Sequence, residues 1–390
     1  MSRSCRNGVV WVCLSLATTA GCACESGTGV PDASRAGDAS MHDATAFTPD
    51  GGGLDGGSEL DAPTSPDAPS TADAGPRECA LPPACDAPYP DFGPTSPWRH
   101  TVGTPITVAL GSPRHRGRDL FLREGDPQWA LAKFAYGLAD DDIQDEDVDI
   151  YLDRNCEGMW ETLGLATTTN DGDHEPIEGV EDTGGRVYYE IPAAMRLGPG
   201  RHRLLFVVRG DHSTGEQLID VVPPSTRFVV TDVDGTQTES ETAAWGSLLT
   251  GTGPGAQPHG AEALEVFARR GYRILYLTAR PEWLEPRTHA WLDEMGYPPG
   301  LVHTTLGGTG ATGAPAQTFK TDELAALEAR LPGGLAWGIG NTDTDAASYV
   351  SAGLPADHIV SYQFDGEGAT RVDDYAELVT LAQALPALCE

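Results

Sequence analysis

Two aspartates one residue apart end a short apolar run in the C-terminal half of this 390-residue chain. The run, 228–231, has the length and the β-branched content of a buried strand, and Asp232 and Asp234 follow it directly. Buried carboxylates are costly unless they are paired or bind a metal ion. A divalent cation together with a phosphoryl group would compensate both carboxylates. The pair therefore predicts phosphoryl chemistry.

Polar side chains also follow the neighbouring predicted strands and can supply the other parts that phosphoryl transfer needs. In an open parallel sheet, ligands bind beyond the carboxyl ends of the strands, so these loops are expected to converge. The candidates are Thr278, Arg280, Lys320, which stands just before a predicted helix, Asn341 and Asp345.

Each candidate suits a particular task. Asp232, which is better fixed by the strand, can attack phosphorus, and Asp234 can then act as general acid and base. Mg²⁺ prefers oxygen ligands, and Asp232, the backbone carbonyl of Asp234 and Asp345 could supply them. Thr278 and Lys320 can bind phosphate oxygens. Gly235 allows a turn whose N–H groups face an anion, and Thr236 follows it in the same phosphate-binding loop.

These motifs resemble the haloacid dehalogenase superfamily of phosphatases. Three segments look like its lipin-type domain, which includes phosphatidate phosphatases and a related domain of phosphatidylinositol-transfer proteins: Asp-Val-Asp-Gly-Thr-Gln-Thr, Tyr-Leu-Thr-Ala-Arg-Pro and Gly-Asn-Thr-Asp-Thr-Asp. The resemblance covers about residues 226–365. It implies an aspartyl-phosphate intermediate, Mg²⁺ as cofactor, and Asn341 with Asp345 as metal ligands. The superfamily usually has an acid where this chain has Asn341.

Two functions from different classes follow. The first is a Mg²⁺-dependent phosphatase that hydrolyses a phosphomonoester, with phosphatidate or another phospholipid as candidate substrate. The alternative is a non-catalytic surface protein that binds phospholipid or phosphate in the same pocket; a third, weaker idea places the function in the β domain.

Only a loop and one helix separate the first two motifs, so we expect an open site without a large lid domain. Arg280 could bind substrate or brace its loop.

Residues 225–390 are predicted to form a doubly wound parallel α/β domain, because strand-like and helical patterns alternate along them. The expected strands are 227–231, 273–277, 301–305, 335–339 and 358–362. The expected helices are 259–270, 284–295, 321–331, 345–351 and 373–385.

Residues 79–224 are predicted to form an all-β, sandwich-like domain. Short β-like runs are separated by clusters of Gly, Pro and Asp, and no clear helical period appears. The expected strands are 105–110, 129–136, 148–152, 186–191, 202–209 and 217–222.

The chain carries 58 acidic and 25 basic residues, a formal net charge of −33. Such a chain repels nucleic acid, so we expect no nucleic-acid partner. The basic residues are nearly all arginine, and Lys133 and Lys320 are the two lysines. Since lysine is a compact point charge and arginine a planar fork, a lysine in this chain suggests a place where arginine would not serve.

The first 22 residues read as an export signal: Arg3 and Arg6 precede a short apolar run, and small residues precede Cys22. This arrangement is similar to a bacterial lipoprotein signal and predicts an exported, cell-envelope protein that is either anchored through a lipid on Cys22 or periplasmic. Residues 23–78 are predicted to be a disordered acidic linker.

Export permits disulfides among the remaining cysteines, Cys24, Cys79, Cys85, Cys156 and Cys389. Cys79 and Cys85 are close enough in sequence to pair, and Cys156 with Cys389 could join the two domains. The sequence leaves the pairing open, as it does the oligomeric state.

Overall fold

The computed structural model describes residues 78–240 and 253–389, and these residues belong to one compact unit. The predicted signal peptide (1–22), Cys22 with its predicted lipid, and all but the last residue of the predicted linker (23–78) lie outside the described residues. None of the helices described is long and apolar enough to cross a membrane.

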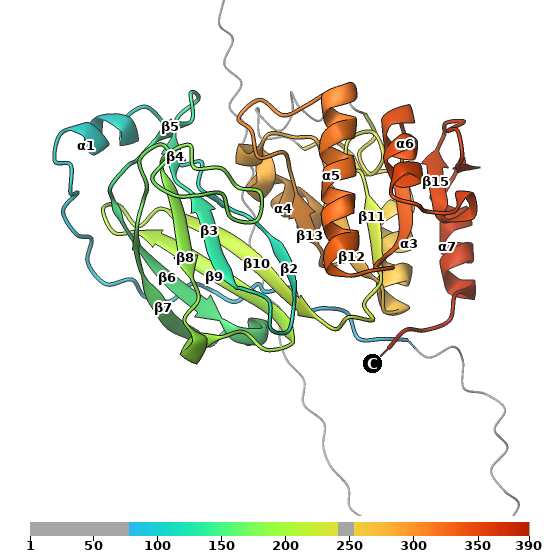
Figure 1. The fold of residues 1–390 in the computed structure, drawn as a ribbon, viewed down its shortest axis with the longest axis horizontal. Coiled ribbons are helices and arrows are strands. Elements are labelled where there is room, and N and C mark those ends of the chain that lie inside the picture. Colours follow the sequence, from blue (N-terminus) through green and yellow to red (C-terminus); the bar gives the residue numbers. More distant parts are fainter. Residues whose placement is uncertain (1–77, 241–252, 390) are drawn as a thin grey trace, which may run out of the picture. The chain divides into compact units, whose positions relative to one another are not determined.

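The C-terminal half contains a parallel sheet of six strands (Figure 1). Its order is β13-β12-β11-β14-β15-β16, and every neighbouring pair is parallel. The central strand β11 therefore has β12 on one side and β14 on the other, which makes its end a switch point of the topology. The strands are β11 (Phe228–Thr231), β12 (Arg273–Leu277), β13 (Leu301–His303), β14 (Leu335–Gly340), β15 (Ile359–Tyr362) and β16 (Thr370–Val372).

Helices cover both faces of this sheet. Val229 and its neighbours on one face pack against α3 (Gly260–Arg269) and α7 (Tyr375–Ala384). Phe228 and Val230, which point the other way because strand side chains alternate, pack in a core with α5 (Ala314–Arg330) and α6 (Asp343–Ser351). The remaining helical elements here are η3 (Glu282–Leu284), α4 (Glu285–Glu294) and η4 (Ala356–His358). The doubly wound α/β fold expected from the sequence is confirmed.

The start of α5 differs from the sequence prediction. The helix begins at Ala314, with Gly313 at its N-cap and Pro315 in its first turn, and not near Thr321. Proline suits the first turn because its missing N–H would have no partner there. Lys320 therefore lies inside a helix and is held by its backbone, rather than in the loop before it.

The preceding domain is a β-sandwich, as predicted. A five-stranded sheet of order β2-β10-β9-β6-β7 shares one apolar core with a three-stranded sheet of order β1-β3-β8. The strands are β1 (Arg116–Gly117), β2 (Leu120–Arg123), β3 (Trp129–Lys133), β6 (Asp147–Asp153), β7 (Trp160–Thr167), β8 (Arg186–Glu190), β9 (Gly200–Val208) and β10 (Thr214–Val222), and the short pair β4 (Ala135–Tyr136) and β5 (Asp141–Asp142) lies beside them. Two 3₁₀ turns are also present, η1 (Arg154–Cys156) and η2 (Ala193–Met195).

The predicted strand 105–110 is wrong: these residues fall largely in a short helix, α1 (Gly103–Val108). Their alternating pattern suggested a half-buried strand, but Ile106 and Leu110 are exposed and Thr104 is buried. The Thr104 hydroxyl donates to Glu146 Oε1 at 2.6 Å, which ties the helix to the sandwich. The sequence analysis also missed β2, which is short, and β7, which contains polar residues on both faces.

Residues of the sandwich pack directly against the α/β domain. Phe121 and Val222 belong to the same apolar core as Phe228. Charged pairs surround this contact and are largely buried: Arg116 and Arg186 with Glu282, Arg118 with Glu323, and Arg330 with Glu178. The two domains therefore share both apolar and ionic contacts.

The Glu323 pair predicts an acid-sensitive contribution to stability. Burial alone would raise the pKa of Glu323, but Arg118 and His303 lower it from the ordinary 4.5 to about 2. Because the folded pKa lies below the unfolded one, the stabilisation is complete above pH 4.5 and is lost as the pH falls towards 2. We expect Glu323→Gln to remove up to about 3 kcal/mol of this pH-dependent stability, measured by urea unfolding between neutral and acidic pH.

The control is Glu367→Gln, because Glu367 is exposed. The free energy of unfolding of that variant should depend on pH as it does in the wild-type protein. If the free energy of unfolding of Glu323→Gln changed with pH in parallel with that of the wild type, the role assigned to the Glu323 ion pair would be contradicted.

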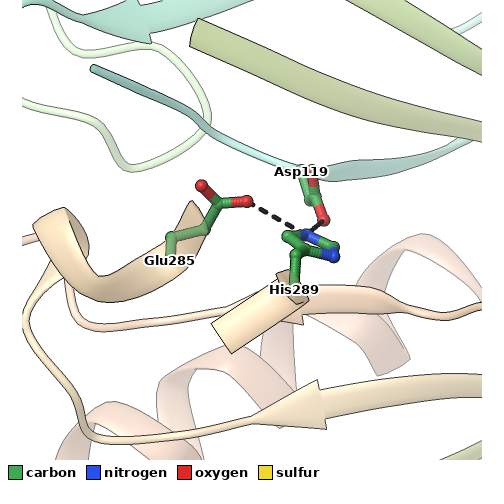
Figure 2. Close-up of side chains that lie close together, drawn as sticks. All are labelled: Asp119, Glu285 and His289. Atoms are coloured by element: carbon green, nitrogen blue, oxygen red, sulfur yellow. Dashed lines mark hydrogen bonds and ion pairs between the residues drawn. The ribbon is translucent and has the colours of Figure 1, made fainter. Parts of the chain in front are cut away.

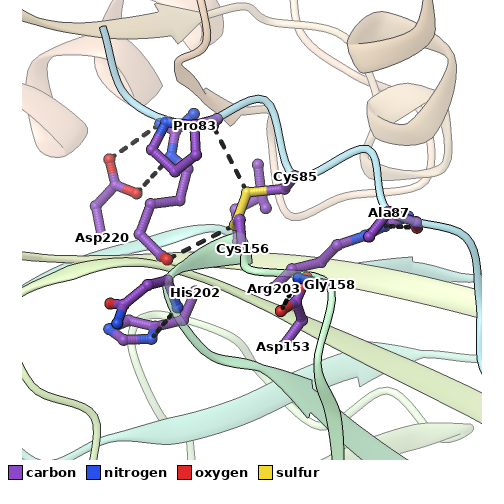
Figure 3. Close-up of a disulfide and its surroundings, with 12 residues drawn as sticks. Pro83, Cys85, Ala87, Asp153, Cys156, Gly158, His202, Arg203 and Asp220 are labelled. Atoms are coloured by element: carbon purple, nitrogen blue, oxygen red, sulfur yellow. Dashed lines mark hydrogen bonds and ion pairs between the residues drawn. A yellow bond between two sulfur atoms is a disulfide. The ribbon is translucent and has the colours of Figure 1, made fainter. Parts of the chain in front are cut away.

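Two disulfides pair the cysteines differently from the pairs that the sequence suggested. Cys79 is bonded to Cys389, and Cys85 is bonded to Cys156, as Figure 3 shows for the second bond. The suggested pairs Cys79–Cys85 and Cys156–Cys389 are therefore both wrong. The backbone N–H of Cys79 donates to Arg269 O at 2.7 Å, and that of Leu388 donates to Arg270 O at 2.7 Å. Both segments are thus held at the end of α3, which brings Cys79 to Cys389 and leaves Cys85 beside the sandwich.

The Cys79–Cys389 bond spans 310 residues and the Cys85–Cys156 bond spans 71. In the chain-entropy account a longer loop restricts the unfolded state more. We expect replacing Cys79 and Cys389 by serine to lower the free energy of unfolding by about 2–5 kcal/mol, and by roughly 1 kcal/mol more than the same change at Cys85 and Cys156. Chemical unfolding of the two double variants under non-reducing conditions measures the difference, and the reverse order would refute the prediction.

Candidate functional site

The predicted site residues converge at the carboxyl ends of three adjacent strands. Asp232 and Asp234 follow β11, Thr278 and Arg280 follow β12, and Asn341 follows β14. Lys320 reaches the same place from α5, and Asp345 from the first turn of α6. Hydrogen bonds connect these side chains in two neighbouring groups. One group contains Asp232, Thr236, Lys320, Asn341 and Asp345, and the other contains Asp234, Thr278 and Arg280. Among the residues described, α3 and β12 lie between Asp234 and Thr278, and η3, α4, β13 and the start of α5 lie between Arg280 and Lys320.

Lys320 links two carboxylates. Its Nζ lies 2.6 Å from Asp232 Oδ1 and also contacts Asp345 Oδ1. All three side chains are buried, with Asp232 4% and Lys320 6% exposed. Burial disfavours the ammonium form, but the two carboxylates raise the pKa of Lys320 above its ordinary value.

Asp345 also caps α6. Its Oδ2 accepts hydrogen bonds from the Thr342 hydroxyl at 2.7 Å and from the backbone N–H groups of Asn341 and Thr342, while Thr342 caps Asp345 in return. This reciprocal capping box fixes the start of the helix. A side chain at Gly340 would meet Asp345, since a Cβ there would lie 2.3 Å from Asp345 Cβ. Glycine at 340 therefore lets Asp345 approach the strand end.

Asp234 is held by Arg280 and Thr278. Arg280 Nε lies 3.0 Å from Oδ2 and its Nη2 lies 2.9 Å from Oδ1, while the Thr278 hydroxyl donates to Oδ2 at 2.8 Å. Arg280 is 1% exposed and is braced at its other end by the Thr288 hydroxyl. The contacts described for the Arg280 guanidinium are with Asp234 and Thr288.

The Thr236 hydroxyl lies between Asp232 and Asn341. Its oxygen lies 3.0 Å from Asp232 Oδ2 and 2.8 Å from Asn341 Oδ1. One hydroxyl carries one hydrogen, so it can donate to only one of these two oxygens at a time. Gly235 turns with a φ of 75°, and its N–H donates to the Thr238 hydroxyl at 2.8 Å.

The cluster has three carboxylates, Asp232, Asp234 and Asp345, and two cations, Lys320 and Arg280. With all five ionised its net charge is −1, and each cation is already in contact with a carboxylate. Burial raises the pKa of Asp232 to about 7, with Asp345 and Asp234 adding to the rise and Lys320 opposing it. The cluster as it stands is therefore poorly suited to accept a phosphate dianion.

A divalent cation fits part of this donor set. Asp232 Oδ2 and Asn341 Oδ1 both lie within hydrogen-bond distance of the Thr236 hydroxyl, and both are oxygen ligands of the kind that Mg²⁺ accepts. Both oxygens of Asp345 are engaged by Lys320 and by the helix cap. Asp232 and Asn341, with the carbonyl of Asp234, are the residues that would hold Mg²⁺, and Asp345 would orient Lys320 beside them.

The sequence analysis missed the side chains that hold the strand-end loop. Tyr375 donates to the carbonyl of Thr236 at 2.8 Å, and the Tyr349 hydroxyl lies 3.0 Å from the carbonyl of Ile339 and 3.2 Å from that of Val230. Both tyrosines are buried and come from helices on opposite faces of the sheet. Nothing in their sequence context marks them, because their role depends on packing between distant segments.

The fold and the strand-end cluster together define a β-sandwich followed by a haloacid dehalogenase-like α/β domain. Residues 229–362 match the family described as PITM 1-3, LNS2 domain, and residues 113–221 match PITM 1-3, beta-sandwich domain. The order of the two matched domains is that of the structure.

Several curated proteins are similar over about half of this chain. Protein retinal degeneration B of Drosophila melanogaster is 30% identical over 201 residues, which is 51% of this chain and 14% of that protein. Membrane-associated phosphatidylinositol transfer protein 2 of Homo sapiens is 32% identical over 190 residues, 48% of this chain and 13% of that protein. The match thus spans about a seventh of the length of these relatives.

Among solved structures, one of titin kinase and its flanking domains aligns with 32% of this chain and 22% of its own, at 7% identity and a TM-score of 0.16. A likeness of that size carries no argument about fold or function.

Proposed function

We propose that the α/β domain binds the phosphomonoester head group of a phospholipid at the strand-end cluster, together with Mg²⁺. The observation that carries this proposal is the charge count. Three carboxylates face two cations, so a divalent cation would change the net charge from −1 to +1 and make room for an anionic phosphate. Lys320, held inside α5, would then face both the carboxylates and the phosphate.

The relatives support a phospholipid as the ligand. Two of the relatives that match about half of this chain are named as membrane-associated phosphatidylinositol transfer proteins. A monoester head group, as in phosphatidate, presents a terminal phosphate that can enter a narrow site at a strand end. A diester head group covers that phosphate with a second substituent.

Hydrolysis of the bound monoester is a second candidate function, favoured by the presence of Asp232 at the position of a nucleophile. Its Oδ1 is oriented by Lys320 and its Oδ2 by Thr236, as an attacking carboxylate requires. Asp234, the predicted proton donor, has both oxygens engaged by Arg280 and Thr278. Turnover would require Asp234 to leave Arg280, whereas binding would not, and for this reason we place binding first.

The predicted export signal and the lipid on Cys22 would bring the site to a membrane. A chain of net charge −33 is repelled by an anionic lipid surface, so a covalent anchor would offset that repulsion. The strand-end site would then need to recognise only a head group that protrudes from the bilayer.

Vesicle flotation tests this proposal. The full chain carrying Cys22→Ser, so that no acyl anchor contributes, would be mixed with phosphatidylcholine vesicles containing either phosphatidate or phosphatidylglycerol. We expect flotation with phosphatidate in the presence of Mg²⁺, and little with phosphatidylglycerol or in EDTA. Equal flotation with both anionic lipids would contradict recognition of a monoester.

Phosphate release measured in the same samples separates the two candidates. Flotation without release supports binding alone. Release that depends on Mg²⁺ supports hydrolysis.

A further inference from the structure

Asp119, Glu285 and His289 form a second cluster that shares no residue with the strand-end site (Figure 2). Asp119 immediately precedes β2 of the sandwich, and Glu285 and His289 lie one helical turn apart on α4. His289 Nε2 lies 2.9 Å from Asp119 Oδ2 and 3.0 Å from Glu285 Oε1. One ligand atom from each side chain lies within 4.8 Å of the other two.

The two carboxylates in this cluster are satisfied unequally. Asp119 accepts the backbone N–H of Leu218 on Oδ1, at 2.8 Å, and that of Val302 on Oδ2, at 2.9 Å. Among the residues described, Glu285 has no donor to its carboxylate except the imidazole of His289, yet it is only 5% exposed. Nε2 carries at most one hydrogen, which cannot serve both carboxylates fully. Leaving a buried carboxylate short of donors is costly.

Among the residues described, both arginines that line the cavity beside this cluster are already paired with other carboxylates. The cavity has a volume of about 470 Å³, and Asp293 and Glu216 also line it. Arg201 and Arg203 line it too, but Arg201 is paired with Asp220 and Arg203 with Glu216. The cavity therefore offers an excess of carboxylates and space for water beside the three convergent ligand atoms.

We propose that Asp119, Glu285 and His289 bind a divalent transition-metal ion of the Zn²⁺ type, with water from the cavity completing the coordination. A neutral imidazole and two carboxylates would balance the charge of such an ion, and this mixed nitrogen and oxygen set suits zinc. Ligand atoms about 2.1 Å from a tetrahedral ion lie roughly 3.4 Å apart, so the present separations of 2.9 and 3.0 Å need to open by about 0.4 Å.

Such an ion would connect the two domains. Asp119 belongs to the sandwich and the other two ligands belong to α4 of the α/β domain. His289 and Glu285 are spaced i, i+4 and so present their ligand atoms from one face of a helix. Metal binding at this place would stabilise the packing of the sandwich against α4, because an ion that binds only the folded form shifts the folding equilibrium.

Cobalt spectroscopy on the full chain tests the proposal. The purified protein would be freed of metal with EDTA, which is then removed, and titrated with Co²⁺ while the visible absorption of the ion is recorded. We expect one equivalent of tetrahedral Co²⁺ per chain, displaced by Zn²⁺, and a rise in melting temperature with Zn²⁺. Glu285→Gln and His289→Gln should each weaken Co²⁺ binding at least about tenfold.

Two controls isolate the cluster. His303→Gln removes another buried histidine that is paired with a carboxylate, Glu323, and should leave the Co²⁺ spectrum unchanged. Asp232→Asn alters the strand-end site and should also leave it unchanged, so this test is independent of the proposed function. Absence of a tetrahedral Co²⁺ spectrum in wild type would overturn the proposal. An unchanged Co²⁺ affinity in the folded Glu285→Gln and His289→Gln variants would overturn it as well.

Discussion

Replacing Lys320 with methionine is expected to lower the free energy of unfolding by about 3–5 kcal/mol, because it leaves two buried carboxylates without their shared cation. Asp232 and Asp345 both contact Nζ and are 4% and 1% exposed. The same change takes the cluster from a net charge of −1 to −2, so phosphatidate binding should weaken more than tenfold. Urea unfolding and vesicle flotation measure the two effects.

The other lysine provides a matched control. Lys133 pairs with Asp142 at 3.0 Å and also donates to the Thr183 hydroxyl. Lys133 pairs with one carboxylate, whose side chain is 19% exposed, whereas Lys320 is shared by two carboxylates whose side chains are 6% and 1% exposed. Lys133→Met should therefore lower the free energy of unfolding less than Lys320→Met does, and it should leave phosphatidate binding intact.

Adding Asp232→Asn to Lys320→Met should restore part of the lost stability. A double variant no more stable than Lys320→Met would argue against the account in which Lys320 is the shared cation of Asp232 and Asp345.

Asp232→Asn is expected to abolish any phosphate release, by at least about 10³-fold, while preserving or strengthening phosphatidate binding. The amide keeps the shape of the side chain but cannot attack phosphorus. It also removes one of three negative charges from the cluster. Parallel assays of phosphate release and vesicle flotation with Mg²⁺ measure both parts of the prediction.

We expect the Asp232→Asn variant to be at least as stable as the wild-type protein at pH 8. In EDTA, burial raises the pKa of Asp232 from its ordinary 3.8 to about 7, so ionisation of this carboxyl lowers stability progressively as the pH rises from about 4 to 7, and the loss is complete above 7. The amide does not titrate, and its melting temperature at pH 8 should equal or exceed that of wild type. Loss of phosphatidate binding in a variant that remains folded would mean that Asp232 is needed for binding itself.

The sequence predicts the strand-end cluster because short-range patterns encode it. The apolar run before Asp232 and the alternation of strand and helix together place β11, β12 and β14 side by side, and the parallel sheet then gathers their ends. These are local periodicities, and their outcome follows from general rules of α/β folds. The fold of both domains was predictable for the same reason.

The partners of each side chain were not predictable from the sequence. Arg280 could face a ligand or a neighbouring carboxylate, and only the packing of the loop after β12 directs it to Asp234. Lys320 lies inside α5 and not before it, because the helix begins in the segment Gly313-Ala314-Pro315, upstream of the apolar pattern that predicts a helix from Thr321. The disulfides and the Asp119–His289 contact join residues far apart in sequence, for which no periodicity exists.

The central claim is that the strand-end cluster binds a phosphomonoester together with a divalent cation. Calorimetric titration of a soluble, short-chain phosphatidate into the full chain tests it most directly, with short-chain phosphatidylglycerol as the matched diester. We predict saturable binding of one phosphatidate per chain in Mg²⁺, at least about tenfold weaker in EDTA or in Lys320→Met, which corresponds to 1.4 kcal/mol or more. Equal affinity for the two lipids, or an affinity unchanged by both EDTA and Lys320→Met, would contradict it.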